Sequence, residues 1–156
     1  MSRMRITLDT NVLVSGFIAK RGNPALLLEL AVTLEEIQLV LSEPILMEFE
    51  DVLSRDEVRA RFTYTEQAIR QIVRSMRLSA EILRPKSKFR VIRDDPKDDV
   101  VLNTAHDGNV DYIVSGDNHI LKLRKFRGIK IVNPREMIKI LARSFPELIY
   151  DFLKVL

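Results

Sequence analysis

Cysteine is absent from this chain of 156 residues, and glycine occurs only 5 times. Without cysteine the protein has no disulfide framework, no thiol nucleophile and no zinc–thiolate site. This composition suits a reducing compartment, so we expect a cytoplasmic location. The scarcity of glycine, with 46% hydrophobic and 30% charged residues, argues against low complexity and indicates an ordinary folded domain.

Long apolar runs are missing as well. No stretch approaches the roughly 20 apolar residues that a membrane span needs. The first five residues lead into a strand-like run rather than into a secretory apolar region. We therefore expect no membrane partner. The net charge of +3 is mildly basic, which permits a nucleic-acid partner without pointing to one.

Strand-like and helix-like segments alternate along the chain. Short apolar runs predict strands at 5–9, 37–41, 80–83, 112–114 and 129–132. Periodicity and capping signals predict helices at 24–32, 42–53, 65–78, 97–107, 118–123, 134–141 and 145–156. Asn23, Ser42 and Asn133 are expected to cap helices that carry proline in their first turn.

This alternation predicts an α/β fold, a three-layer α/β/α sandwich around a central parallel sheet. There is no internal repeat and no domain-sized linker. We expect one domain spanning residues 1–156, closed by a helix from about residue 145. That last segment is rich in large apolar residues and is expected to join the core, with a contact to another protein chain as the alternative.

Four acidic residues stand beside structural signals that aim them toward a common place. Asp9 and Asp117 each follow a predicted strand, and in open α/β sheets ligands bind outside the carboxyl ends of strands. Gly116 is expected to let the backbone bend sharply and present Asp117. Asp98 lies in the first turn of a predicted helix and projects from its apolar face.

The fourth acid is less well defined by the residues alone. Glu48 lies at one edge of the apolar stripe of its helix and Glu50 lies at the other, so periodicity does not choose between them. Each acid also has an ordinary structural interpretation. An acidic first turn complements the helix dipole, an aspartate after a strand fits a turn, and a glutamate beside an apolar stripe is often solvated.

The joint pattern nevertheless points to chemistry. Crowded carboxylates repel one another unless a positive charge lies between them. A hard divalent cation with oxygen ligands, such as Mg²⁺ or Mn²⁺, is the natural neutraliser. The pattern therefore predicts a metal-dependent phosphodiester hydrolase.

Three motifs together resemble those of the PIN-domain family of metal-dependent ribonucleases. They are Ile-Thr-Leu-Asp-Thr-Asn-Val-Leu at 6–13, Asp-Pro-Lys-Asp-Asp-Val-Val-Leu-Asn-Thr-Ala at 95–105, and Asp-Tyr-Ile-Val-Ser-Gly-Asp at 111–117. The resemblance extends from about residue 4 to residue 141. This version of the motifs is similar to the VapC-like subfamily, the toxin components of toxin–antitoxin pairs.

The resemblance implies a set of site residues. The acids that would hold the metal and support catalysis are Asp9, Glu48, Asp98 and Asp117. Glu48 is preferred to Glu50 on this ground. In the cluster of Asp94, Asp95, Asp98 and Asp99, the choice of Asp98 rests on its spacing of seven from Ala105. Asn11 and Ser115 are expected to support the site through hydrogen bonds, Asn11 by orienting Asp9.

The implied reaction is endonucleolytic hydrolysis of an RNA phosphodiester by a water molecule that Mg²⁺ or Mn²⁺ activates. The carboxylates would hold the ions, and no side chain would act as the nucleophile. The implied partners are RNA, an antitoxin protein, and further copies of the chain in a homodimer or higher homo-oligomer.

An acidic pocket needs positive charge nearby to attract RNA, and two basic groups are candidates. Arg84, Lys86, Lys88 and Arg90 alternate and would share one face of an extended segment. Lys122, Arg124, Lys125 and Arg127 follow Asp117 closely, and this second group is the preferred nucleic-acid-binding set for that reason. A solvated loop is the alternative for both groups.

The two histidines, His106 and His119, have no partner at metal-ligand spacing, which argues against a zinc site. A surface role is expected for His119, with a substrate contact as the alternative. An aspartyl phosphatase is disfavoured because Asn11 stands where that class needs a second acid. A dinucleotide-binding fold is disfavoured because no Gly-x-Gly-x-x-Gly follows the first strand.

Other functions for the same fold stay open. One is a catalytically silent module that binds nucleic acid or protein, against which the four intact acids argue. Another is a housekeeping nuclease that acts in RNA processing or on structured DNA. Structured-DNA nucleases usually carry extra duplex-binding segments, for which 156 residues leave little room.

Overall fold

The computed structural model describes residues 3–92 and 98–155. Its strands are β1 (Met4–Leu8), β2 (Ile37–Ser42), β3 (Glu81–Leu83), β4 (Tyr112–Val114), β5 (Lys125–Phe126) and β6 (Ile129–Val132). Its helices are α1 (Thr10–Ile18), α2 (Asn23–Thr33), α3 (Glu43–Ser54), α4 (Asp56–Arg61), α5 (Glu66–Ser79), α6 (Asp99–Asp107), α7 (Asn118–Leu121), α8 (Pro134–Ser144) and α9 (Pro146–Val155). Among these described residues, none of the helices has both the length and the apolar character needed to cross a membrane.

The strands form one sheet in the order β3-β2-β1-β4-β6-β5. All neighbouring pairs are parallel except β5 with β6, which is antiparallel. The chain moves outward from β1 to β2 and β3, and then returns to the other side of β1 with β4. The strand order therefore reverses between β1 and β4, and ligands bind in the crevice at such a switch point.

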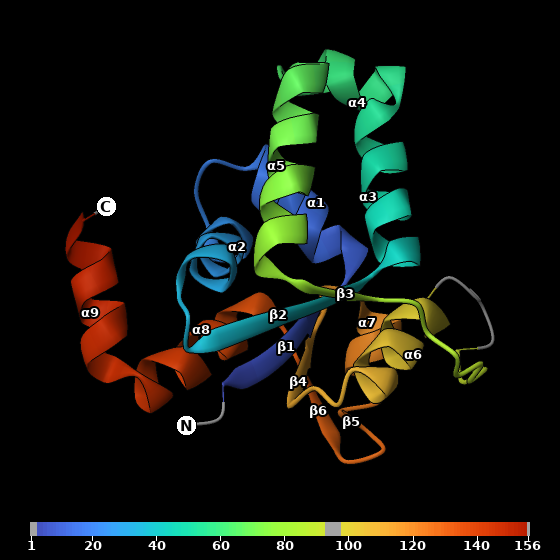
Figure 1. Ribbon diagram of the computed structural model, residues 1–156, viewed down its shortest axis with the longest axis vertical. Coiled ribbons are helices and arrows are strands. Elements are labelled where there is room, and N and C mark those ends of the chain that lie inside the picture. The colour runs from blue at the N-terminus through green and yellow to red at the C-terminus, as the bar shows by residue number, and fades with distance from the viewer. Residues whose placement is uncertain (1–2, 93–97, 156) are drawn as a thin grey trace.

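Helices cover both faces of this sheet, which confirms the predicted α/β/α sandwich. Figure 1 shows α1 to α5 on one side of β2 and β3, with α6 and α7 on the other side. The core is made of fully buried aliphatic side chains from the sheet and from the helices on it, such as Ile6, Leu39, Leu46, Leu102 and Ile113. Both faces of a parallel sheet are buried in this way because its crossover connections place helices on each face.

Two of the three predicted caps are confirmed. The Ser42 hydroxyl accepts a hydrogen bond from the backbone N–H of Ile45, and the Asn133 side chain accepts one from Glu136. The prediction for Asn23 is wrong. The cap position of α2 is Gly22, whose φ of 107° is one that glycine adopts readily, and Asn23 is the first helical residue.

Three elements were not predicted: α1, α4 and β5. The segment that follows Asp9 was expected to be a polar turn and is a helix, although valine and glycine within it lower its helix propensity. The packing of its buried side chains Val12 and Leu13 in the hydrophobic core stabilises the helix despite its low propensity. The strand β5 is only two residues long, and it is flanked by Arg124 and Arg127 at positive φ.

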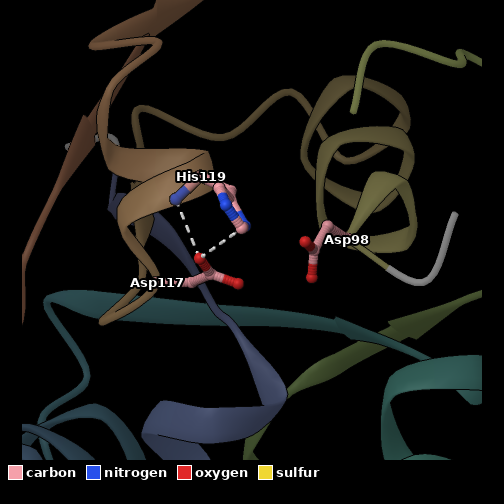
Figure 2. A group of neighbouring side chains, drawn as sticks. All are labelled: Asp98, Asp117 and His119. Atoms are coloured by element: carbon pink, nitrogen blue, oxygen red, sulfur yellow. Dashed lines mark hydrogen bonds and ion pairs between the residues drawn. The ribbon is translucent and has the colours of Figure 1, made fainter. Parts of the chain in front are cut away.

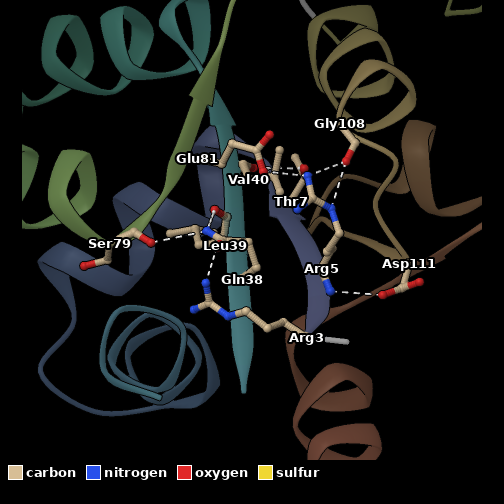
Figure 3. A network of polar contacts seen from close by, with 10 residues as sticks. All are labelled: Arg3, Arg5, Thr7, Gln38, Leu39, Val40, Ser79, Glu81, Gly108 and Asp111. Atoms are coloured by element: carbon tan, nitrogen blue, oxygen red, sulfur yellow. Dashed lines mark hydrogen bonds and ion pairs between the residues drawn. The ribbon is translucent and has the colours of Figure 1, made fainter. Parts of the chain in front are cut away.

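The C-terminal end of α6 is anchored by a polar network around Arg5 (Figure 3). The Arg5 guanidinium donates to the carbonyl of Gly108 at 2.7 and 3.0 Å and pairs with Glu81 at 2.7 Å. These contacts join β1, β3 and the end of α6 near the amino ends of the strands. The opposite end of α6, which begins at Asp99, is thereby directed toward the carboxyl ends.

Two glycines in this region differ in what their surroundings require. A Cβ at Gly108 would lie 2.6 Å from Val40 Cγ1 and 3.1 Å from the carbonyl oxygen of Thr104, so the close approach of α6 to β2 depends on glycine. Gly116 has no atom within 4 Å of such a Cβ and is not among the residues with positive φ. The expectation that Gly116 provides a sharp bend is therefore not supported.

We predict that Gly108→Ala destabilises the protein by about 1–3 kcal/mol, because the added methyl group overpacks a buried contact. Gly116→Ala should change the free energy of unfolding by less than about 1 kcal/mol, since its site is open. Chemical denaturation of the two variants measures both effects. Equal stabilities would contradict the packing argument.

Candidate metal centre

The site begins where β1 ends. Asp9 follows Leu8, which pairs with Val114 of β4, so the residues after both strands are neighbours. Asp9 Oδ2 accepts a hydrogen bond of 2.9 Å from the Ser115 hydroxyl, and that same hydroxyl oxygen accepts one of 3.0 Å from the backbone N–H of Asp117. The fully buried Ser115 thus bridges Asp9 and the backbone of Asp117.

The other oxygen of Asp9 is held by Thr10 rather than by Asn11. Asp9 Oδ1 accepts from the backbone N–H of Thr10 at 2.8 Å. Asn11 is exposed, and within the described part of the chain its side chain makes no hydrogen bond to Asp9. The prediction that Asn11 orients Asp9 is therefore corrected.

Thr10 also connects the first strand to α3. Its buried hydroxyl donates to Glu48 Oε2 at 3.1 Å, which turns Glu48 toward the end of β1. Glu48 is half-buried, whereas Glu50 is exposed. The structure thus supplies the distinction between the two glutamates that periodicity could not make.

The remaining acids meet from the other side of the switch point. One ligand atom from each of Asp98, Asp117 and His119 lies within 4.8 Å of the others. Figure 2 shows Asp98 at the start of α6 facing Asp117 and His119 across a short gap. Asp117 Oδ1 also accepts the backbone N–H of His119 at 2.8 Å and lies 3.7 Å from its Nδ1.

His119 is the residue of this cluster that the sequence did not assign to a site. Its proximity to Asp98 depends on packing α6 beside α7, which no short spacing in the chain records. The sequence contains one local signal that could have placed His119 in the site. A histidine two residues after a capping aspartate shares the first helical turn with that aspartate, so both side chains face the same region.

The neighbouring acid Asp99 has a structural role instead. It is only 4% exposed, and its Oδ1 accepts the backbone N–H groups of Val91 and Ile92, each at 2.9 Å. Asp98 is half-buried. Geometry thus separates Asp98 from Asp99, while Asp94 and Asp95 lie outside the described residues.

Three of the four predicted acids occupy helix N-cap positions: Asp9 for α1, Asp98 for α6 and Asp117 for α7. The exposed N–H groups at a helix N-terminus favour negative charge nearby. The first turns of α1 and α7 hold two of these carboxylates directly, since Asp9 accepts the backbone N–H of Thr10 and Asp117 accepts that of His119.

The surroundings of Asp9 disfavour its ionised form. Burial, with smaller contributions from the charges of Glu48 and Asp117, raises the pKa of Asp9 from 3.8 to about 6, although hydrogen bonds from Ser115 and Thr10 oppose the change. In the described residues neither Asp9 nor Glu48 forms an ion pair with lysine or arginine. Within the described residues the site is therefore a group of neighbouring carboxylates.

The fold and the site together define an α/β domain with converging carboxylates at the switch point of its sheet. The family model described as "PIN domain" matches residues 5–119, more than half of the chain. The chain therefore belongs to the PIN domain family, as its motifs indicated.

Two known proteins are similar to it. The uncharacterized protein MJ1680 of Methanocaldococcus jannaschii is 28% identical over 145 residues, which cover 88% of this chain and 91% of that protein. A chain of the VapBC2 complex from Rickettsia felis, solved bound to a DNA fragment from its promoter, aligns with a TM-score of 0.53 and 15% identity over 83% of this chain and 98% of its own. The latter likeness concerns the fold.

The donor set fits a divalent cation. Carboxylate oxygens from Asp98 and Asp117 are the ligand type that Mg²⁺ and Mn²⁺ prefer, and the nearby acids add negative charge. The imidazole of His119 extends the set toward the softer transition metals. Since burial, together with the neighbouring acids, raises the pKa of Asp9, the protein's stability offers a test that needs no substrate.

In EDTA we predict that Asp9→Asn stabilises the protein by about 2–3 kcal/mol above pH 7 and has little effect below pH 4. The folded-state pKa of about 6 exceeds the unfolded value of 3.8, so folding favours the protonated acid. The contribution of Asp9 to stability therefore falls as the pH rises from 4 to 6. Urea denaturation across this range measures it.

The matched control is Asp151→Asn, at an exposed acid of α9. It should leave the pH profile of the wild type unchanged. An Asp9→Asn profile parallel to the wild-type profile would contradict the prediction.

Proposed function

We propose that this protein is a Mg²⁺- or Mn²⁺-dependent endoribonuclease that hydrolyses RNA phosphodiesters, acting as the toxin component of a toxin–antitoxin pair. The proposal rests on the convergence of Asp98, Asp117 and His119 at the switch point of a PIN domain. Asp9 lies beside them, connected to the Asp117 backbone by the Ser115 hydroxyl. Membership of the family supports nuclease activity in general.

Each residue has a distinct task under this proposal. Asp98 and Asp117 would hold the cation, and Asp9 and Glu48 would complete its acidic surroundings. When bound, the cation would supply an activated water and stabilise charge on the phosphoryl oxygens. Ser115 would fix the relative positions of Asp9 and Asp117, and Thr10 would keep the Glu48 carboxylate turned inward.

The hydroxyl of Ser115 has a particular part in this arrangement. Because it donates to Asp9 and accepts from the Asp117 backbone, the two acids cannot move apart without breaking a buried hydrogen bond. Preorganised charged groups act on a transition state without reorganising during the reaction. Ser115 is thus a positioning residue rather than a catalytic one.

The toxin assignment and the partners rest on similarity. The VapBC2 complex was solved bound to a DNA fragment from its promoter, and the shared fold supports an antitoxin partner here. A homo-oligomer is also proposed, and the exposed Tyr150 and Leu153 of α9 offer apolar surface for it. A cytoplasmic location remains a prediction from the lack of cysteine.

We predict that Asp98→Asn and Asp117→Asn each lower RNA cleavage by more than about 100-fold with Mg²⁺ or Mn²⁺, because each removes a charged metal ligand. Glu48→Gln should also impair cleavage. Its matched control is Glu50→Gln, on the same helix but exposed, which should retain wild-type activity. The measurement is cleavage of labelled single-stranded RNA, with thermal unfolding of each variant as a folding check.

The outcomes separate the parts of the proposal. Unchanged cleavage by both aspartate variants would refute the site. Cleavage of DNA flaps but not of RNA would refute the ribonuclease assignment and keep the metal chemistry. Mn²⁺ binding without cleavage of any nucleic acid would favour a catalytically silent binding module.

A further inference from the structure

The segment at residues 84–92 has no regular secondary structure, yet side chains at three positions along α6 accept hydrogen bonds from its backbone. Asp107 Oδ2 accepts the N–H groups of Lys86 at 2.6 Å and Ser87 at 3.0 Å, and Asp107 Oδ1 also accepts the Ser87 hydroxyl. Further along, Asn103 accepts the N–H of Phe89 at 2.8 Å. Asp99 accepts those of Val91 and Ile92.

This attachment follows from matching repeats. Asp99, Asn103 and Asp107 are four residues apart, so they share one helix face with a spacing of about 6 Å. Alternate N–H groups of an extended chain point the same way at intervals of about 6.6 Å. The helix therefore places an acceptor beside every second residue from Ser87 to Val91, and its two end acceptors also bind the N–H groups of Lys86 and Ile92. The segment is thus held extended and antiparallel to α6.

An extended backbone sends alternate side chains to opposite sides. Lys86, Lys88 and Arg90 are exposed, whereas Ser87 and Phe89 are partly buried between them. The backbone attachment thus displays one row of cations about 6.6 Å apart. Arg84 would begin this row, but it lies near Glu43, whose pKa is lowered mainly by hydrogen bonds from Arg77 and to a smaller extent by the charge of Arg84.

The second basic group contacts this segment through Phe89, on the side opposite the row. The Phe89 ring packs edge-on against Phe126 of β5 with centroids 5.3 Å apart, and the guanidinium of Arg127 lies 4.7 Å from its centroid. We call Lys86, Lys88 and Arg90 the cationic track. In the described part of the chain none of these three forms an ion pair.

The track has a direction. It starts at Asp107, at the C-terminal end of α6, and its last attachment is Asp99, the residue next to Asp98. Asp98 belongs to the cluster with Asp117 and His119. The cations therefore lead along α6 to the acidic site, and Figure 1 shows the segment leaving β3 and passing beside α6.

We propose that the cationic track binds successive phosphates of single-stranded RNA and guides the strand into the acidic site. The identity of the ligand rests on the proposed function. A single row of charges matches one phosphate backbone, and phosphate contacts position a strand without reading its bases. Because the Phe89 face carries Arg127, the track offers charge rather than a stacking surface, and binding should be insensitive to sequence.

The first test removes the charge. In EDTA, where RNA is not cut, the variant K86Q/K88Q/R90Q should bind a fluorescent single-stranded RNA at least about 10-fold more weakly at 50 mM salt, and the slope of log K against log salt should fall by about 2. The matched control is R74Q/K139Q/R143Q, which removes three exposed cations from α5 and α8 and should change neither quantity. Equal effects of the two triple variants would overturn the track.

The second test leaves the charge intact and loosens the attachment. Asn103→Ala removes the central acceptor, so it should weaken RNA binding without changing the net charge. The control Gln71→Ala, at an exposed position of α5, should bind as the wild type does. If Asn103→Ala also binds as the wild type does, the extended attachment has no part in binding. Melting temperatures show whether each variant folds.

These tests fail separately from the proposed nuclease activity. Track-dependent RNA binding by a protein that does not cut RNA with Mg²⁺ or Mn²⁺ would keep the track and refute the nuclease. If Asp98→Asn loses cleavage while K86Q/K88Q/R90Q cleaves with the KM and kcat of the wild type, the nuclease activity would stand and the track would be refuted. Preference for duplex over single-stranded RNA, or no RNA binding by the wild type, would overturn the track as proposed.

Discussion

The parallel pairing of β1 with β4 determines the rest of this site. Their register sets Leu8 opposite Val114, so Asp9 and Ser115, the next residues of the two strands, emerge side by side at one edge of the sheet. The single hydroxyl of Ser115 then links Asp9 to the Asp117 backbone. A slip of one residue would turn these side chains to opposite faces and separate the acids. The positions of α3 and α6 matter because they deliver Glu48 and Asp98 to this same edge.

Crowding acids at one edge costs stability, and the fold offsets this cost with its backbone. Backbone N–H groups at the starts of α1 and α7 bind the carboxylates of Asp9 and Asp117, and hydrogen bonds from Ser115 and Thr10 stabilise the ionised form of Asp9. Burial and the neighbouring charges still outweigh them, since the pKa of Asp9 rises to about 6. Functional sites commonly keep a destabilising arrangement of charged groups, because their activity requires that geometry. Neutralisation of these charges by a cation would couple ion binding to folding.

What the sequence could and could not predict follows from the range of the interactions. Strand ends are local, so the placement of Asp9 and Asp117 at one edge was accessible from apolar runs. The proximity of Asp98 to His119 is not local, because it depends on how α6 packs beside α7. Glu48 and Glu50 were indistinguishable by periodicity, and only the hydroxyl of Thr10 separates them. The emphasis on Asn11 failed because a helix begins directly after Asp9 and leaves that side chain exposed.

The charge distribution along α6 explains why a net charge of +3 says little about this molecule. The helix carries Asp98, Asp99 and Asp107, yet two of these acids accept backbone N–H groups of the segment beside them. Their hydrogen bonds hold that segment extended, and Lys86, Lys88 and Arg90 extend from it into solvent. The sequence favoured the basic residues after Asp117 because they are close to it in the chain. We propose the alternating residues before α6 instead, because hydrogen bonds to an acidic helix order them into a row that runs toward the start of α6.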